Sequence, residues 1–378
     1  MSVYLDYNAT APVRPEVLEA VTAALVDGGN PSSIHAAGRK ARATMERARE
    51  QVAELIGAAP NRLVFTSGGT EANALAIESA VAAGSRCLLI SAAEHPSVRE
   101  SAHASDAEVE EWPVDVDGRA DLPWLCDRLA RWDAEREGPP FAALMLANNE
   151  TGVIQPVEVA AAMLHQHGGR LHVDAVQAAG KVLVDMEALG ADTLSVAAHK
   201  LGGPGGVGAL AYAPGAPVRR RLHGGGQERG LRAGTENVCG IAGFGAAAEA
   251  ARKGLSRFAD QAEWRDAAAA RLHEKAPVIV LAENVERLPN TLCFATSGFE
   301  AARQLMALDL AQVMVSAGSA CSSGKVKPSH VLTAMGLEEQ AGCAIRVSGG
   351  WATTEADWVK FVEVWLEAYE RHRSLRAA

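Results

Sequence analysis

Aromatic residues, paired cysteines, long apolar runs and excess positive charge are all scarce or missing in this sequence of 378 residues. No run of about 18 apolar residues occurs and no basic-then-apolar segment opens the chain, so neither a membrane span nor a secretion signal is expected. The formal charge of -10 opposes binding to nucleic acid, because phosphate backbones attract basic surfaces. We therefore expect no nucleic-acid partner and no membrane partner.

The six cysteines are widely spaced and include no Cys-x-x-Cys pair. This spacing argues against a disulfide framework and against a structural zinc site, and it favours a reducing cytoplasm. Cys87 and Cys293 lie in apolar runs and Cys126 lies in a helical stretch. These three thiols are predicted to be packed and unreactive.

Cys321 has a different setting, because small and polar residues surround it over positions 316–324. Lys325 and Lys327 follow, and nearby positive charge favours the thiolate, which is the nucleophilic form of cysteine. The sequence therefore predicts an exposed loop with a nucleophilic cysteine. A tolerated surface cysteine is the alternative interpretation.

Strand-like apolar runs alternate with helical stretches over the first two thirds of the chain. The candidate strands are 63–66, 87–91, 108–112, 142–146, 171–174, 193–197 and 207–212, and helices are expected at 70–83, 96–103, 122–132 and 157–167. Such alternation predicts an α/β fold with a mostly parallel seven-stranded sheet and helices on both faces. The glycine-rich turn after Lys200 is too short for a crossover helix, so the last two strands can pair antiparallel.

The regular alternation of strands and helices ends after this region. One long polar helix is predicted over 256–275, closed by Pro277, since proline cannot continue a helix. Strands are expected at 278–281, 291–295, 313–316 and 344–348, with a last helix over 354–371. The length suggests about two domains. We predict a large domain over 15–255 and a smaller α/β domain formed by 1–14 and 256–378, which carries the Cys321 loop.

Polar or ionisable groups follow five of the predicted strands. In an open α/β sheet, ligands bind outside the carboxyl ends of the strands, so these groups predict a site at one sheet edge. They are Ser67 to Thr70, Glu94 with His95, Asn148 to Glu150, Asp174 with Gln177, and His199 with Lys200.

Lys200 ends a buried strand and precedes a run of glycines, which places its amine at the mouth of a cleft. Partial desolvation there suits a lysine to Schiff-base chemistry. Residues 203–208 also match the pattern G-x-G-x-x-G of dinucleotide-binding loops. That fingerprint has to open a helix, whereas a strand is predicted here, so we disfavour binding of a dinucleotide.

Three of these groups together indicate one kind of site. Gly69 and Thr70 lie before a helix and can cradle a phosphate, although simple capping is the alternative. Asp174 would be a buried carboxylate in need of a partner, either a protonated pyridine nitrogen or an Arg or Lys. Lysine, carboxylate and phosphate cradle together are the fixed points of a pyridoxal-phosphate site. Arg346, in an apolar strand, would bind either a substrate carboxylate or an internal acid.

With these residues assembled, the chain resembles the cysteine desulfurases, which are class V members of the fold-type I pyridoxal-phosphate enzymes. The likeness covers the chain nearly end to end. Its motifs begin at Leu5, Gly29, Phe65, Glu94, Asn148, His172, His199, His223 and Ser319.

The resemblance implies roles for the residues at the sheet edge. Lys200 would bind pyridoxal 5'-phosphate covalently, Asp174 would pair with the pyridine nitrogen, and Gln177 would contact the ring hydroxyl. His95 would stack on the ring and help to move protons. Asn149 would lie at the cofactor as well.

The phosphate and the substrate carboxylate are assigned in the same way. Gly69, Thr70 and His199 would hold the phosphate, and Thr235 would reach the phosphate of a neighbouring subunit, which implies a homodimer. Asn149, Arg346 and Asn30 would fix the carboxylate of the substrate.

By the same resemblance, the reaction removes sulfur from L-cysteine and leaves L-alanine and a persulfide on Cys321. The sulfur acceptor would be an iron–sulfur scaffold protein, and Cys321 could share a transient [2Fe–2S] cluster with it. Two features depart from the family pattern. Ala197 replaces a serine found in many relatives, and Ser-Gly-Gly-Trp at 348–351 replaces Ser-Leu-Gly-Arg.

Two other functions compete with this one. Another class V enzyme, such as a selenocysteine lyase, an aminotransferase or a kynureninase, would share the lysine, aspartate and phosphate cradle, so Cys321 discriminates against it. A non-catalytic sulfur carrier or scaffold-binding protein would not need Lys200, Asp174 and His95.

Overall fold

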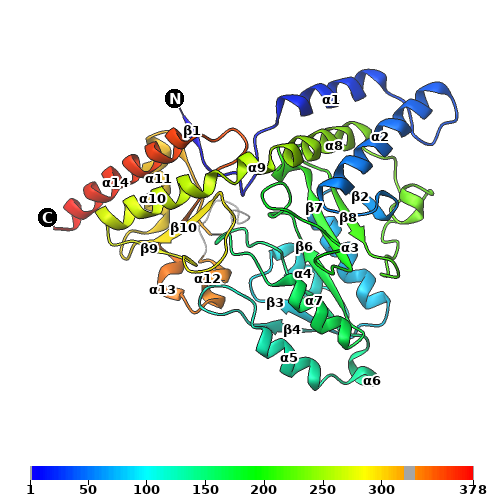
Figure 1. Ribbon diagram of the computed structural model, residues 1–378, viewed down its shortest axis with the longest axis horizontal. Coiled ribbons are helices and arrows are strands. Elements are labelled where there is room, and N and C mark those ends of the chain that lie inside the picture. The colour runs from blue at the N-terminus through cyan, green and yellow to red at the C-terminus, as the bar shows by residue number, and fades with distance from the viewer. Residues whose placement is uncertain (1, 319–327, 378) are drawn as a thin grey trace.

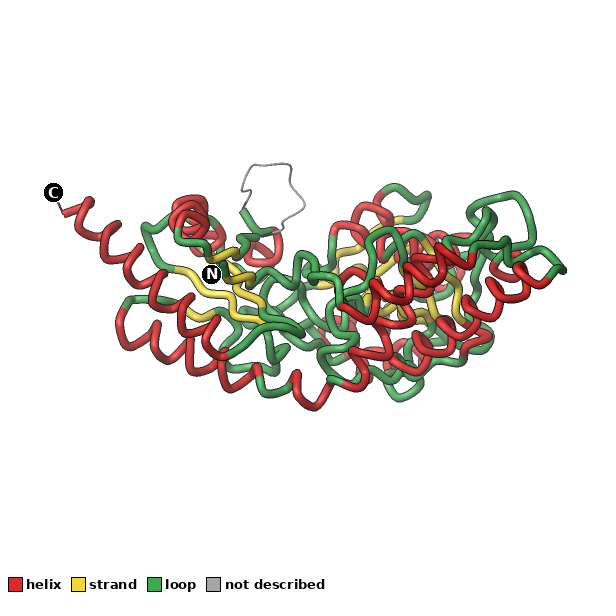
Figure 2. The backbone as a smooth tube through the Cα atoms, turned by 90° about the horizontal axis from the view of Figure 1, so that it is seen from above, coloured by secondary structure: helices red, strands yellow, loops and turns green. Residues whose placement is uncertain are grey.

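Two lobes lie side by side in the computed structural model, which describes residues 2–318 and 328–377. The larger lobe holds a seven-stranded sheet and the N-terminal helices, and the smaller lobe holds the short sheets together with the C-terminal helix (Figure 1). The view from above separates the same two bodies, with loops running between them (Figure 2).

The seven-stranded sheet has the order β2-β8-β7-β6-β5-β3-β4. Its strands are β2 (Leu63–Thr66), β3 (Cys87–Ser91), β4 (Glu108–Trp112), β5 (Phe141–Ala143), β6 (Arg170–Asp174), β7 (Thr193–Ala197) and β8 (Gly208–Tyr212). β8 runs antiparallel to both neighbours and every other pair is parallel. The predicted fold class and the antiparallel pair after Lys200 are confirmed.

Helices cover both faces of this sheet because successive strand residues point to opposite sides. On β3, Leu89 packs into the cluster that includes α1, α2, α5, α7 and α8, whereas Leu88 and Ile90 face α3 and α4. These helices, with the short α6, are α1 (Pro15–Asp27), α2 (Ala36–Leu55), α3 (Gly69–Ala82), α4 (Pro96–His103), α5 (Leu122–Ala130), α6 (Ala134–Glu137), α7 (Val157–Gln166) and α8 (Val238–Lys253).

Among the described residues, the smaller lobe is built from short strands and six helices. Its strands are β1 (Val3–Tyr4), β9 (Ile279–Val280), β10 (Thr291–Ala295), β11 (Val313–Met314) and β12 (Ala344–Ser348), paired as β1-β11 and β12-β10-β9. Its helices are α9 (Leu255–Phe258), α10 (Gln261–Lys275), α11 (Ala301–Leu310), α12 (His330–Ala334), α13 (Glu338–Ala341) and α14 (Glu355–Ala377).

The single long helix predicted over 256–275 is wrong, because α9 and α10 are separate helices. The backbone at Ala259 and Asp260 is close to helical, but the next amides bond three residues back, Ala262 to Ala259 and Glu263 to Asp260. This tightened turn divides the helix without a proline or glycine to signal it.

The N-terminal segment joins the core of the smaller lobe. Val3 and Leu5 pack in one apolar cluster with Trp358, Phe361 and Trp365 of α14. The proposed division into domains at residues 14 and 255 stays a prediction. In the part of the chain that the structure describes, no helix is both long and apolar enough to cross a membrane.

Candidate active site

A cavity of about 370 Å³ opens where the carboxyl ends of β5, β6 and β7 face the N-terminal segment and β12. Nine of the twelve residues predicted for the site line it, namely Gly69, Thr70, His95, Asn149, Asp174, Gln177, His199, Lys200 and Arg346. The structure therefore gathers residues that are as much as 277 positions apart, from Gly69 to Arg346, at one place.

Asp174 ends β6 and is only 5% exposed. Its Oδ2 accepts a hydrogen bond from Asn73 Nδ2 (2.8 Å), and its Oδ1 accepts one from the backbone N–H of Val176 (2.9 Å). Both donors are uncharged. The carboxylate therefore has capacity for a cationic partner in the cavity that it lines.

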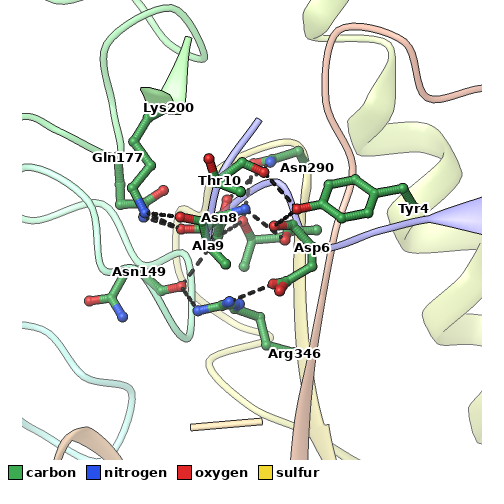
Figure 3. A network of polar contacts seen from close by, with 12 residues as sticks. Tyr4, Asp6, Asn8, Ala9, Thr10, Asn149, Gln177, Lys200, Asn290 and Arg346 are labelled. Carbon is green, nitrogen blue, oxygen red and sulfur yellow. Dashed lines mark hydrogen bonds and ion pairs between the residues drawn. The ribbon is translucent and has the colours of Figure 1, made fainter. Parts of the chain in front are cut away.

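Lys200 follows β7 in a short 3-10 turn, Ala198–Lys200. Its Nζ donates to the backbone carbonyl oxygens of Asn8 (2.5 Å) and Ala9 (2.9 Å) in the N-terminal segment, as Figure 3 shows. The amine thus sits at the junction between the N-terminal segment and the larger lobe. The glycines after it let β8 fold back as a strand, which confirms that the run at 203–208 does not open a helix.

His95 caps α4, with Pro96 at the first helical position. Its Nδ1 accepts from the backbone N–H of Ser97 (3.1 Å), so a neutral His95 carries its proton on Nε2. Burial lowers the pKa of His95, while the charge of Asp174 opposes that shift. Neighbouring Glu94 is fully buried, and its burial followed by the charge of Asp174 raises its pKa well above the usual value.

The predicted phosphate cradle lies at the start of α3. Gly69 is the first helical residue, and a Cβ added to it would lie 2.9 Å from Cγ2 of Val176, so a larger residue would press against this side chain of the cavity lining. His199 lies beside this end of the cavity with Nδ1 3.3 Å from Thr10 Oγ1. Burial, and then the charge of Lys200, lower the pKa of His199 to about 4, so it can donate a hydrogen bond as a neutral ring.

Arg346 lies in the middle of β12 and is 2% exposed. Its Nη2 pairs with Asp6 Oδ1 (2.7 Å) and its Nη1 donates to the backbone oxygen of Asn149 (3.0 Å), as Figure 3 shows. Among the described residues, its Nε has no hydrogen-bond partner. The internal ion pair that was one of the two predicted interpretations is therefore present, and Arg346 also lines the cavity.

Two predicted residues that the structure describes do not line the cavity of this chain. Asn30 lies on the exposed loop between α1 and α2, where its Oδ1 accepts from the N–H of Ser32. Thr235 is also exposed, before α8. Cys321 lies outside the described residues. The prediction that Cys126 is packed is wrong, since it is exposed on α5, whereas Cys87 and Cys293 are buried.

The structure shows which residues surround the two departures from the family pattern. Ala197 lines the cavity, where a methyl group cannot donate a hydrogen bond. Gly350 packs directly under the ring of Tyr7, which leaves no room for a Cβ, and Gly349 faces the amide of Gln261 in the same way. Trp351 donates from Nε1 to the backbone oxygen of Pro12 (2.9 Å). These residues therefore seat the N-terminal segment against the smaller lobe.

Sequence reasoning missed three polar residues that support the site. Asn8 and Asn73 are each 1% exposed, and Lys181 is 5% exposed. Asn8 and Asn73 lie within the motifs that begin at Leu5 and Phe65, and Lys181 interrupts an apolar stretch. A lysine in such a stretch is a usable signal, because a buried lysine has to be paired.

The groups at this cavity and the doubly covered sheet define a class of protein. Residues 3–361 match the model of the aminotransferase class-V family, so the chain belongs to that family. A cysteine desulfurase of Cereibacter sphaeroides is 42% identical over 99% of this chain and 97% of its own length. A cysteine desulfurase IscS of Dictyoglomus turgidum is 39% identical over 99% and 96%.

Solved structures agree with these relatives. A NifS-like protein from Rickettsia africae superimposes with a TM-score of 0.90 at 32% identity, covering 98% of this chain and 100% of that one. Within the class-V family, the chain belongs to the cysteine desulfurases.

Proposed function

We propose that this protein is a pyridoxal-phosphate-dependent cysteine desulfurase that converts L-cysteine to L-alanine and leaves the sulfur as a persulfide on Cys321. The supporting observation is the composition of the cavity. A lysine amine, a buried carboxylate, a histidine and an arginine converge there from four separate segments, as Lys200, Asp174, His95 and Arg346.

The residues present fit pyridoxal 5'-phosphate. The two donors to Asp174, Asn73 and the backbone of Val176, are both neutral, so this carboxylate can take a cationic partner. The Oδ1 of Asn149 is buried without a hydrogen-bond partner among the described residues. The N-terminus of α3 faces the cavity at Gly69 and favours an anion. When bound, this cofactor supplies an electron sink that stabilises negative charge at the substrate α-carbon.

By the likeness to the cysteine desulfurases we assign the holding residues, all of which line the cavity. Lys200 would bind the cofactor covalently, Asp174 would pair with its pyridine nitrogen, and Gln177 would contact its ring hydroxyl. Gly69, Thr70 and His199 would hold its phosphate. Asn149, which also lines the cavity, would contact the cofactor and the substrate.

The protein's own proton carriers follow from the same geometry. Because burial lowers the pKa of His95, its ring is neutral near pH 7. It can take up a proton only at Nδ1, in place of the hydrogen bond from the Ser97 N–H, where Ser97 Oγ at 2.8 Å can accept the new N–H. Because its Nδ1 is occupied by Ser97, the proton of the neutral ring is on Nε2. Arg346 would bind the substrate carboxylate through N–H bonds that Asp6 and Asn149 leave unused.

The sulfur step uses Cys321. Its thiolate would attack the thiol sulfur of the substrate, so that an S–S bond forms as the substrate C–S bond breaks. The electron pair of the broken bond stays with the carbon fragment, which is protonated and leaves as L-alanine. The persulfide would pass to an iron–sulfur scaffold protein, and Cys321 could share a transient [2Fe–2S] cluster with it. A reducing cytoplasm would suit this thiol chemistry.

A homodimer is part of the proposal. Thr235 is exposed and does not line the cavity of its own chain, and it would reach the cofactor phosphate of the second subunit. Large apolar side chains are exposed on α1 and the loop after it, at Leu18, Leu25, Val26 and Ile34. Such a patch is typical of a surface that another chain covers.

The test compares Cys321→Ser with Lys200→Ala after loading with pyridoxal 5'-phosphate. Cys321→Ser should keep the visible absorption band of the bound cofactor and lose sulfide release from L-cysteine by at least about 100-fold, because the nucleophile is missing. Lys200→Ala should lose both. Sulfide production by Cys321→Ser at the wild-type rate would contradict the proposed role of this cysteine.

A further inference from the structure

Lys181 is a buried lysine that the proposed reaction does not use. It lies in the turn region after β6, and it does not line the main cavity, whereas Lys200 does. Its Nζ donates to Gln177 Oε1 (2.7 Å) and to Asn8 Oδ1 (2.7 Å). Both partners are themselves nearly inaccessible, at 5% and 1% exposure.

In both contacts the side-chain amide of the partner, Gln177 or Asn8, has to present its oxygen to Lys181. A lysine ammonium has N–H donors and no acceptor, so the amide atom that faces it has to be oxygen. Burial, and then the charges of Lys200 and Arg346, lower the pKa of Lys181 well below its usual value. A neutral amine would keep the two N–H bonds that these contacts use. Its lone pair could also accept an N–H, but both amide nitrogens already face backbone carbonyl oxygens, which only accept.

The consequence for Gln177 is a fixed amide orientation. Because Oε1 faces Lys181, Nε2 has to point the other way, where it donates to the backbone oxygen of Asn8 (2.9 Å). An amide nitrogen carries two N–H bonds, and Gln177 lines the cavity. The second N–H is therefore available to a hydrogen-bond acceptor in the cavity.

The same orientation is imposed on Asn8. Its Oδ1 accepts from Lys181, and its Nδ2 donates to the backbone oxygen of Asn149 (3.2 Å) and to Thr291 Oγ1 (2.9 Å). The backbone oxygen of Asn8 accepts from Lys200, as Figure 3 shows. Lys181 thus sets the direction of two amides that border the amine of Lys200.

We propose that Lys181 is a positioning residue, which keeps Gln177 turned so that it offers N–H, and not C=O, to the ring hydroxyl oxygen of the bound cofactor. This inference rests on the proposed function. A donor at that oxygen stabilises its anionic form, whereas a carbonyl in the same place would repel it. Lys181 acts through Gln177 and does not touch the reacting atoms.

The test uses the full-length protein loaded with pyridoxal 5'-phosphate, as wild type, Lys181→Met and Lys181→Arg. Lys181→Met removes the donor at similar length, whereas Lys181→Arg keeps a donor-only side chain. We expect Lys181→Met to displace the visible absorption maximum and to weaken cofactor binding about tenfold, because a buried amide loses its partner and can turn. Lys181→Arg should retain the wild-type band.

Two further variants separate positioning from folding. Lys253→Met removes an exposed lysine paired with Glu249 and should change neither band nor affinity. In a Gln177→Met background, Lys181→Met should add no further displacement of the band. If Lys181→Met does not fold, Lys181→Leu, which also lacks a donor, takes its place and should displace the band in the same direction.

The outcomes distinguish the inference from the function on which it rests. A wild-type protein with no cofactor band would overturn the proposed function. If the wild type shows the cofactor band and Lys181→Met has the same band and the same cofactor affinity, the positioning role is overturned and the proposed function stands. This holds even if Lys181→Met is less stable to heat. A displacement by Lys181→Met that persists in the Gln177→Met background would also overturn it.

Discussion

Behind Asp174, two buried side chains continue its hydrogen bonds into the core. Asn73 donates to Asp174 from Nδ2, so its Oδ1 is the atom that lies 3.0 Å from Nε2 of His172. His172 therefore carries a proton on Nε2, and its Nδ1 lies 2.9 Å from the hydroxyl of Thr193 as an acceptor. Burial lowers the pKa of His172 to about 4. The ring stays neutral and holds Asn73 against the carboxylate.

A pH dependence of stability follows for His172. In the unfolded chain its pKa is about 6.5, so between about pH 6.5 and 4 the unfolded state binds a proton that the folded state does not. Stability should fall as the pH falls through this window, by up to about 3 kcal/mol from this group.

The measurement is urea unfolding at several pH values between 4.5 and 7, in steps chosen around the expected window of about pH 4 to 6.5. His172→Gln, which has a donor but no titration in this range, should show a flatter dependence than the wild type. His103→Gln, at an exposed position at the end of α4, is the control and should keep the wild-type slope. Equal slopes for His172→Gln and wild type would refute this account.

At the scale of elements, α8 is packed closely on α2 and supports the turn that carries Lys200. Ile241 and Phe244 of α8 share one apolar cluster with Ala198 and Leu201 on either side of that lysine. A Cβ added at Gly245 would lie 2.6 Å from Cα of Ala48, which is backbone and cannot move aside. The closeness of the two helices thus depends on this glycine.

Gly245→Ala should therefore lower the free energy of unfolding by about 1–3 kcal/mol, because overpacking forces the helices apart. Gly342→Ala is the matched control, since an added Cβ there meets nothing within 4 Å and the backbone φ is ordinary. It should change the stability by less than about 0.5 kcal/mol. Chemical denaturation of both variants checks this, and equal effects would contradict it.

Element positions were largely predictable, because apolar runs and end signals are local. The predicted strand ends placed Asp174, His199 and Lys200 at one edge, as the structure has them. The break between α9 and α10 was not predictable, because it depends on a tightened turn that has no proline or glycine. The packing role of Gly245 was not predictable either, because it depends on contact with α2, which is distant in the sequence.

At the scale of the whole molecule, the contacts that complete the site span the chain. The backbone N–H of Asn8 donates to Ser348 Oγ (3.0 Å), and its side chain bonds to Thr291, both in the smaller lobe. The same residue accepts from Gln177 and Lys200 of the larger lobe. No sequence pattern reports a contact across 340 positions, so the meeting of the two lobes at Asn8 could not be predicted.

We propose that residues 15–255 form one domain and that 1–14 and 256–378 form the other, with Asn8 as a main link between them. Apolar clusters support this division, because Val3 and Leu5 pack with α14 while Val17 packs with the large sheet. Asn8→Ala would remove a buried amide and leave Lys181, Asn149 and Thr291 each without one partner.

Asn8→Ala should lower the free energy of unfolding by about 2–3 kcal/mol, because several buried polar groups lose partners at once. It should also separate the unfolding of the two lobes, since each keeps its own apolar core. Calorimetry should show one transition for the wild type and two for the variant. Asn61→Ala, at an exposed position, is the control and should behave as wild type. A single transition of Asn8→Ala at the wild-type midpoint would show that the lobes are joined by other contacts.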